Sequence, residues 1–223
     1  MTTAPASPLV YVVDDDAALR DSLCWLIRSA DLEVEAHPSA DSFLRAFSEA
    51  RPCCILLDVR MPGMTGMELQ EELRRRGAAA PIVFMTGHGD VPMAVRALKA
   101  GAFDFIEKPF DDGIMLDRIR AAVAHHRVLL EDRAQRQAVL ARWQTLTPRE
   151  RQVMRLVAGG QMNKRIAHDL DISLKTVEVH RHNVMEKMAA ASVADLTRML
   201  LALGDAAADA GPVPPVPPGP SDR

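Results

Sequence analysis

The stretch Cys53-Cys54-Ile55-Leu56-Leu57-Asp58-Val59-Arg60-Met61-Pro62-Gly63 decides the fold. A short apolar run that ends at one carboxylate, with Pro and Gly close behind, is typical of a strand buried on both faces. Asp58 is therefore expected at the carboxyl end of a parallel strand, the edge at which open α/β sheets bind ligands. A residue that only caps a turn would fit Asp58 equally well, so both interpretations stay open here.

The first 125 residues repeat this pattern, because apolar runs alternate with segments whose apolar residues recur at helical spacing. The expected strands cover 9–13, 32–36, 53–58, 81–85 and 103–106. Strands that alternate with helices predict an α/β doubly wound domain with a five-stranded parallel sheet. Right-handed crossovers leave few topologies for such a sheet.

Composition limits the class of protein. The chain has 223 residues, of which 48% are hydrophobic, so it can form one large domain or two small ones. No apolar run approaches transmembrane length, and residues 1–8 do not form a signal peptide, so we expect a cytoplasmic protein without membrane contact. Cys24, Cys53 and Cys54 lie in apolar segments without CxxC spacing, which argues against disulfides and zinc and favours core thiols.

The net charge of -3 hides an uneven distribution of charge. Residues 1–126 carry 13 Lys and Arg against 19 Asp and Glu, whereas residues 127–204 carry 13 against 8. A basic second half suggests a nucleic-acid partner for that half alone.

Carboxylates also follow the first strand, which ends at Asp14 and Asp15. Adjacent strands of a sheet lie about 4.8 Å apart, so these side chains can converge with Asp58. Converging anions repel, and a hard divalent cation with oxygen ligands relieves that repulsion. Mg²⁺ is the expected cofactor.

Thr86 follows the fourth strand and Lys108 the fifth, which places a hydroxyl and an ammonium at the rim of the same crevice. A carboxylate nucleophile, a metal, a hydroxyl and a lysine are the groups that phosphoryl transfer to a protein requires. Each piece has an ordinary alternative. The acidic run could be a solvated helix N-terminus, Thr86 a turn former and Lys108 a surface charge. Their occurrence in order at successive strand ends favours a phosphoryl-transfer site.

The second half has a different pattern. Residues 126–143 contain neither Gly nor Pro and are expected to form a largely helical linker. Thr147, Pro148 and Glu150 make a capping box at the start of the first of four short helices, expected at 148–158, 163–170, 174–188 and 192–203. Residues 205–223 are rich in Ala, Asp and Pro and are expected to be disordered or polyproline II, with a PxxP ligand as a weaker alternative.

The helix expected at 174–188 has an apolar face of Val177, Val184 and Met188. Its other face can enter a DNA major groove. A small packing module that uses these charges only for solubility is the alternative.

Residues 8–125 resemble the receiver domain of two-component response regulators, which has a flavodoxin-like sheet. The resemblance is carried by Val12-Val13-Asp14-Asp15, by Leu57-Asp58-Val59-Arg60-Met61-Pro62-Gly63, by Met85-Thr86-Gly87-His88-Gly89-Asp90 and by Phe103-Asp104-Phe105-Ile106-Glu107-Lys108-Pro109-Phe110. It implies that a sensor histidine kinase phosphorylates Asp58, and that Asp14, Asp15, Asp58 and the carbonyl of Arg60 bind Mg²⁺. Thr86 and Phe105 would be the switch residues, Lys108 the lysine of the site, and Lys108-Pro109 a cis bond.

Residues 144–204 resemble the LuxR-type helix-turn-helix DNA-binding domain. The resemblance is carried by Leu146-Thr147-Pro148-Arg149-Glu150-Arg151, by residues 159–167 and by residues 173–183. It implies that contacts to double-stranded promoter DNA come from Lys164, Arg165, Lys175, Thr176, Glu178, Val179, His180, Arg181 and His182. Glu178 departs from the pattern, since many relatives carry a basic residue there.

Together the two halves resemble a response regulator of the FixJ type, and the stretch Gly87-His88-Gly89-Asp90-Val91-Pro92-Met93-Ala94 favours that group. The resemblance implies a transcriptional regulator that forms a homodimer on phosphorylation and works with RNA polymerase. The resemblance also implies that the protein is not an enzyme. A Mg²⁺-dependent phosphohydrolase that uses Asp14, Asp15 and Asp58, and a scaffold protein with a vestigial acidic pocket, are the alternatives.

Overall fold

The computed structural model describes residues 7–87 and 91–204. The chain divides into two compact units, residues 1–131 and 132–223. The loop residues His88, Gly89 and Asp90 and the tail 205–223, which the sequence analysis singled out, lie outside the described residues.

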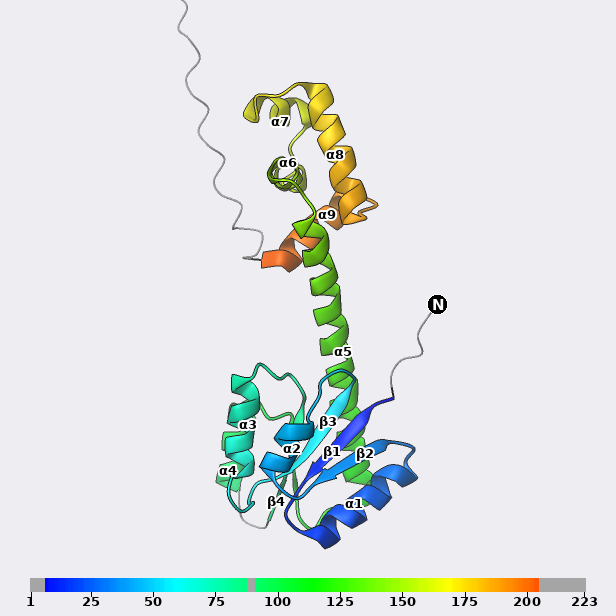
Figure 1. Cartoon of the computed structure of the whole chain (residues 1–223), viewed down its shortest axis with the longest axis vertical. Coiled ribbons are helices and arrows are strands. Elements are labelled where there is room, and N and C mark those ends of the chain that lie inside the picture. The colour runs from blue at the N-terminus through cyan, green and yellow to red at the C-terminus, as the bar shows by residue number, and fades with distance from the viewer. Residues whose placement is uncertain (1–6, 88–90, 205–223) are drawn as a thin grey trace, which may run out of the picture. The chain divides into compact units, whose positions relative to one another are not determined.

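The first unit alternates strands and helices (Figure 1). Its elements are β1 (Leu9–Val13), α1 (Ala17–Ser29), β2 (Glu33–His37), α2 (Ala40–Ala46), β3 (Cys53–Asp58), α3 (Gly66–Arg75), β4 (Ile82–Thr86), α4 (Val91–Lys99), β5 (Asp104–Glu107) and the first part of α5 (Asp112–Gln144).

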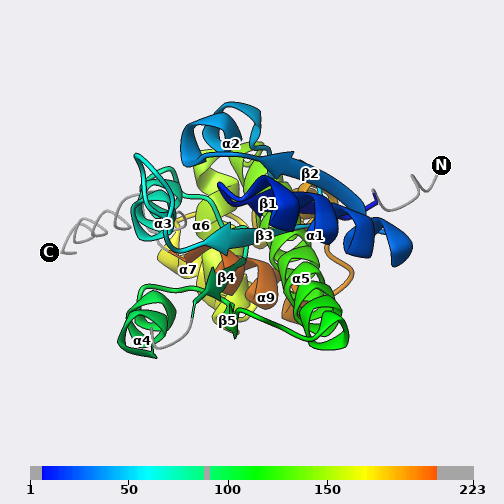
Figure 2. The ribbon, with the colours of Figure 1, turned by 90° about the horizontal axis from the view of Figure 1, so that it is seen from below.

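The strands form one parallel sheet in the order β2-β1-β3-β4-β5. Figure 2 shows α1 and α5 on one face of this sheet and α2, α3 and α4 on the other. The order reverses between β1 and β3, and the carboxyl ends of the strands at such a reversal are where open α/β sheets bind ligands. The predicted doubly wound fold is confirmed.

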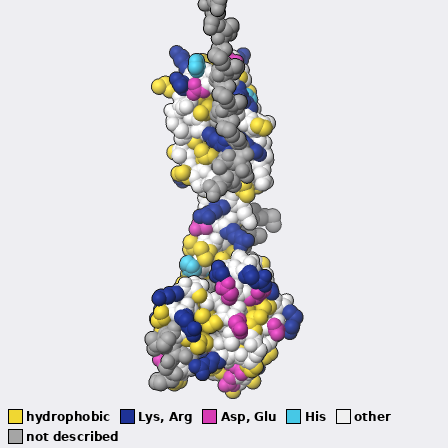
Figure 3. All heavy atoms as spheres, turned by 90° about the vertical axis from the view of Figure 1, so that its left-hand side faces the viewer, with side chains coloured by type: hydrophobic (Ala, Val, Ile, Leu, Met, Phe, Trp, Pro, Cys, Tyr) yellow, Lys and Arg dark blue, Asp and Glu magenta, His cyan; other side chains and the backbone are white. Residues whose placement is uncertain are grey.

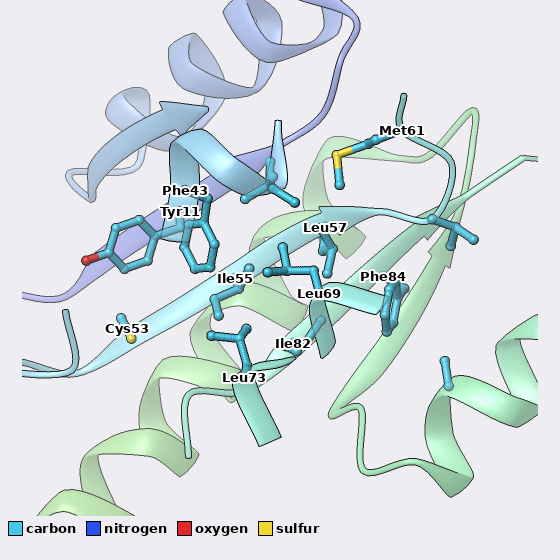
Figure 4. Close-up of a cluster of buried hydrophobic side chains, with 14 of the residues drawn as sticks. Tyr11, Phe43, Cys53, Ile55, Leu57, Met61, Leu69, Leu73, Ile82 and Phe84 are labelled. Atoms are coloured by element: carbon cyan, nitrogen blue, oxygen red, sulfur yellow. The ribbon is translucent and has the colours of Figure 1, made fainter. Parts of the chain in front are cut away.

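The core explains why the central strands read as continuous apolar runs. Every residue of β1, β3 and β4 is buried, and neighbouring residues face opposite sides of the sheet. Figure 4 shows the layer under α2 and α3, where Tyr11, Ile55 and Leu57 of the sheet meet Phe43 and Leu69 of the helices. The other layer packs against α1 and α5.

The cysteines belong to this core. Cys53 and Cys54 are fully buried, and Cys24 is nearly so. Burial raises the pKa of the Cys53 thiol to about 12, so that it remains protonated and unreactive. This supports the expectation of packing thiols.

Up to residue 204, where the described part of the chain ends, the second unit contains only helices: the last part of α5, α6 (Pro148–Ala158), α7 (Asn163–Asp169), α8 (Leu174–Met188) and α9 (Val193–Leu203). Thr147 and Glu150 form the predicted capping box of α6. The core contains Val177, Val184 and Met188 of α8, as the helical pattern predicted.

Helix α5 runs without interruption from Asp112 to Gln144, through the segment expected to link the two domains. Val139 and Trp143, near its end, are buried in the core of the second unit. Part of the expected linker therefore belongs to the second unit. No described helix is both long enough and apolar enough to cross a membrane.

Candidate functional site

Sheet register brings the functional strand ends together. Val13 pairs with Leu57, so Asp14 and Asp58 follow at the same level on adjacent strands. Thr86 pairs with Glu107, the residue before Lys108, and the Lys108 N–H donates to the Thr86 carbonyl at 2.7 Å. The Val59 N–H donates to the Met85 carbonyl at 3.2 Å, which ties the loop after β3 to β4.

Lys108 joins the two buried carboxylates. Its Nζ lies 2.7 Å from Asp14 Oδ2 and 2.6 Å from Asp58 Oδ1. The remaining oxygens accept backbone N–H groups, Asp14 Oδ1 from Asp16 at 2.8 Å and Asp58 Oδ2 from Arg60 at 2.7 Å. Asp14 is 1% exposed and Asp58 7%, so both carboxylates are almost fully buried and Asp58 is the more accessible of the two.

Burial and hydrogen bonding act in opposite directions on the charged groups of the site. Burial raises the pKa of Asp58 above its ordinary value, although the Lys108 ammonium and the Arg60 N–H oppose that shift. Burial alone would lower the pKa of Lys108, but its hydrogen bonds to the carboxylates of Asp14 and Asp58 outweigh burial and raise it. Lys108 is therefore a fixed positive charge beside the Asp58 oxygens.

The acid cluster is only partly assembled as a cation site. Asp15 and Arg60 are exposed, and no group of three or more His, Cys, Asp or Glu within residues 7–87 and 91–204 is placed to hold a metal ion. As possible metal ligands, Asp14 and Asp58 offer carboxylate oxygens, and Asp15, the next residue after Asp14, adds an exposed carboxylate. That donor set suits a hard cation such as Mg²⁺, which keeps several of its waters.

Asp16, the third acid of the run, has another role. Its side chain accepts the N–H groups of Ala18 and Leu19 and caps α1. This agrees with the prediction that the acidic run is a strand-to-helix turn.

The two predicted switch residues differ in exposure but lie on the same face of the sheet. Thr86 is 5% exposed, and its hydroxyl donates to the Gly87 carbonyl at 3.4 Å. Phe105 is 37% exposed and pairs with Phe84, two residues before Thr86. Because side chains two residues apart share a face, Thr86 and Phe105 lie on the same side of adjacent strands.

Gly66 is a residue of the site that the sequence analysis did not identify. A Cβ atom there would lie 2.2 Å from the Asp58 carbonyl oxygen, and the Gly66 N–H donates to the Val59 carbonyl at 3.1 Å. A glycine just before an expected helix is the signal that could have identified it. The Lys108-Pro109 bond is cis, as the resemblance implied.

The second unit has a helix-turn-helix. Helix α7 ends at Asp169, Asp171 adopts φ 50° in the turn, and Ser173 caps α8 by accepting the Thr176 N–H at 3.0 Å. The Arg181 guanidinium donates to Asn163 Oδ1 at 2.8 Å and so fixes α8 to the start of α7. The Lys187 ammonium donates to the buried Glu150 carboxylate and fixes α8 to α6.

The predicted DNA-contact residues divide into two groups. The exposed ones lie on α7 and α8, and they are Lys164, Arg165, Lys175, Glu178, Val179 and His182. Thr176, His180 and Arg181 are half-buried. Figure 3 shows dark blue Lys and Arg side chains at several places on one face of this unit.

Comparison with known proteins identifies a family for each of the two units. A model of the response regulator receiver domain matches residues 10–120, and a model of the bacterial regulatory proteins of the luxR family matches residues 144–200. The transcriptional regulatory protein FixJ of Azorhizobium caulinodans is 49% identical over 92% of this chain and 97% of its own length. Nodulation protein W of Bradyrhizobium diazoefficiens is 45% identical over 91% of this chain and 89% of its own length.

Solved structures of response regulators also resemble this chain. The response regulator StyR has a TM-score of 0.81 at 44% identity, over 88% of this chain and 99% of its own. Full-length FixJ from B. japonicum has a TM-score of 0.55 at 44% identity, over 90% of this chain and 98% of its own.

The fold, the matched families and these relatives define a two-component transcriptional regulator, in which phosphorylation of a receiver domain controls DNA binding by a LuxR-type domain. The receiver domain implies a kinase as partner, and the LuxR-type domain implies DNA. More narrowly, the chain belongs to the response regulators of the FixJ type.

Proposed function

We propose that Asp58 is the residue that accepts the phosphoryl group, from the phosphohistidine of a sensor histidine kinase. The observation that carries this is the contact of Lys108 Nζ with Asp58 Oδ1 at 2.6 Å, at a place where Asp58 is only 7% exposed. An Asp58 oxygen attacks phosphorus, the bond to the histidine nitrogen breaks, and Lys108 offsets the charge on the phosphoryl oxygens. Thr86 at the end of β4 would donate its hydroxyl to one of those oxygens.

Mg²⁺ is the proposed cofactor of this step. Asp14, Asp15, Asp58 and the carbonyl of Arg60 would hold it, and the cation would neutralise charge on the transferred group. Asp14 is already oriented by the Asp16 N–H and by Lys108, so one ligand of the set is in place before the cation arrives.

Phosphorylation is proposed to shift the receiver between two states. When Thr86 turns toward the phosphoryl group it leaves space on the face that Phe105 shares, and Phe105 moves from its exposed position into that space. The surface of α4 and β5 then changes. Val95, Leu98 and Phe105 are exposed there at 45%, 39% and 37%, and an apolar surface of this kind supports a homodimer of phosphorylated chains.

Promoter DNA is the proposed ligand of α7 and α8. Lys164, Arg165 and Lys175 would contact phosphates, and Glu178, Val179 and His182 would face base edges. Arg181 is held by Asn163 and is half-buried, so it would reach DNA only by leaving that partner. Thr176 and His180, in the first half of α8, would contact the DNA backbone.

The remaining assignments follow from this function. Because promoter DNA and RNA polymerase would be partners, we place the protein in the cytoplasm. We assign residues 8–125 to the receiver domain, 126–143 to the linker, 144–204 to the DNA-binding domain and 205–223 to a tail. The site would be phosphorylated once per activation rather than turn over small phosphomonoesters, in keeping with relatives that are transcriptional regulators.

Labelling with a small phosphodonor tests the assignment. Asp58→Asn keeps the size of the side chain but removes the attacking carboxylate, so we expect incorporation of phosphate to fall below about one hundredth of the wild-type level. Asp117→Asn, at an exposed position of α5, is the matched control and should be labelled like the wild type. Undiminished labelling of the Asp58 variant would contradict the assignment.

A further inference from the structure

His126 has no role in the proposed phosphorylation site, yet it is one of the few polar residues of the first unit that is completely buried. It lies on α5 beside the amino end of β3, far along the strand from Asp58. Sequence reasoning had included it in the linker. A buried polar side chain on a helix that leaves its domain calls for an explanation.

The His126 imidazole supplies the hydrogen-bond acceptor that a neighbouring strand would otherwise provide at the start of β3. β3 begins at Cys53 but pairs with β4 only from Ile55 onward, so Cys53 has no partner residue in β4. His126 Nδ1 accepts the Cys53 N–H at 2.9 Å and so satisfies a backbone donor that burial would otherwise leave unpaired. The Cys53 Sγ is 3.3 Å from the same nitrogen.

This contact fixes the protonation form of the ring. A nitrogen that accepts a hydrogen bond carries no proton, so neutral His126 is protonated at Nε2. Burial lowers the pKa of His126, which favours the neutral ring. Nε2 has no hydrogen-bond partner among the described residues, and Glu49 Oε1 lies 4.0 Å from it.

Glu49 extends the arrangement to a third segment. Its Oε1 accepts the N–H groups of Ala79 and Ala80, in the loop before β4, at 2.6 Å and 2.5 Å. The start of β3, the loop that carries Glu49 and the loop before β4 therefore all meet at or next to one imidazole of α5. Beyond His126 the same helix supplies Val139 and Trp143 to the core of the second unit.

We propose that His126 is a positioning residue for signal output: it fixes α5 to the amino end of the strand that carries Asp58, so that a change in the sheet displaces the helix that continues into the DNA-binding unit. The inference rests on the proposed function of Asp58. Without this contact α5 would still pack on the sheet through Met115, Ile119 and Val123, but the turn of α5 that carries His126 would move independently of β3. Phosphorylation would then control DNA binding less strongly.

Paired substitutions separate this role from simple packing. In Asn the side-chain oxygen occupies the place of His Nδ1, whereas in Gln the amide lies one bond further out and cannot accept from Cys53. His126→Asn should therefore keep the Cys53 N–H protected against hydrogen exchange, and His126→Gln and His126→Leu should expose it. His125→Gln, at the exposed neighbouring position, is the matched control.

The functional readout is the ratio of DNA affinities of the phosphorylated and unphosphorylated full-length chain, measured on a genomic fragment that the phosphorylated wild type enriches. We expect His126→Asn and His125→Gln to keep the wild-type ratio within about twofold, and His126→Gln and His126→Leu to lower it by about fivefold or more. All variants should incorporate phosphate at Asp58 like the wild type.

The outcomes are distinguishable. If the wild type itself incorporates no phosphate at Asp58, the proposed function fails, whatever the variants do. If labelling is normal and the Gln variant keeps the wild-type ratio, or the Asn and Gln variants behave alike, the positioning role of His126 is wrong. If the Leu variant does not fold, the comparison of Asn with Gln still decides.

Discussion

At the scale of single residues, the site depends on groups that hold Asp58 in place as much as on Asp58 itself. Lys108 contacts both buried carboxylates, and Gly66 lets the start of α3 approach the Asp58 carbonyl. Asp14, Asp58, Thr86 and Lys108 could be found from sequence because each directly follows or ends a strand. Gly66 and His126 could not, since their roles depend on contacts between segments distant in sequence.

Gly66→Ala tests the close approach to Asp58. The added methyl group would overlap the Asp58 carbonyl, so α3 or the end of β3 must move. We expect the free energy of unfolding of the receiver unit to fall by about 1–3 kcal/mol, and phosphorylation to slow. Urea unfolding measures the first effect.

Gly87→Ala is the matched control, because no atom of the described residues lies within 4 Å of a Cβ atom at Gly87. Its stability should stay within about 0.5 kcal/mol of the wild type. Equal destabilisation by both substitutions would contradict the account of Gly66.

The buried His126 predicts a dependence of stability on pH. Its pKa is lowered in the folded chain from 6.5, so as pH falls below 6.5 the unfolded chain binds a proton that the folded chain does not. Stability is therefore lost as pH falls, by at most about 1.4 kcal/mol per pH unit from this group. His37, whose pKa burial also lowers, contributes in the same direction.

Denaturant unfolding between pH 7 and pH 5 measures the slope. His126→Asn removes a titrating group, so its stability should fall less steeply with acid than that of the wild type. A slope unchanged by the substitution would show that His126 is not buried in its neutral form.

At the scale of helices and strands, the sequence predicted which elements exist better than where they end. The strand expected at 81–85 is Ile82–Thr86, because Pro81 lacks an N–H and contributes only its carbonyl, which accepts the Ile55 N–H. β2 lies at the edge of the sheet and is mostly exposed, so unlike the central strands it is not a continuous apolar run. Composition could not show that α5 runs on into the second unit, where Trp143 enters the core.

Trp143→Ala tests that assignment of α5. Trp143 is 3% exposed, and the guanidinium groups of Arg151 and Arg155 lie 5.4 Å and 5.6 Å from its ring. Loss of this ring should reduce the free energy of unfolding of the second unit by about 3–5 kcal/mol. Hydrogen exchange of α6 to α9 under mild denaturant measures it.

Trp25→Ala provides a comparison with the same change in side chain. Trp25 is 72% exposed on α1, so its removal should alter stability by less than about 0.5 kcal/mol. If Trp143→Ala leaves exchange in the second unit unchanged, the end of α5 is not part of that core.

At the scale of the whole molecule, two folded units share one continuous helix, and the proposed function requires that the state of the first controls the second. Both units could be predicted from the sequence because each contains several characteristic motifs close together in the chain. It gave less information about the coupling between them, which depends on how α5 is held rather than on a local pattern.

Phosphorylation should raise the dimer fraction of the full chain. Burial of Val95, Leu98 and Phe105 between two receivers supplies the gain, and sedimentation velocity with and without a phosphodonor measures it. The Asp58→Asn variant should sediment the same way in both conditions. A phosphorylated wild type that stays monomeric would contradict the dimer step.

The most direct test of the central claim is selection of genomic DNA fragments by the purified full-length protein, with and without phosphodonor, for the wild type and for Asp58→Asn. We predict that phosphorylation raises the wild type's enrichment of a defined set of fragments by at least about fivefold. The variant should show no such gain. Equal enrichment by the wild type in both conditions, or a phosphodonor-dependent gain in the Asp58→Asn variant, would contradict the claim that Asp58 controls DNA binding.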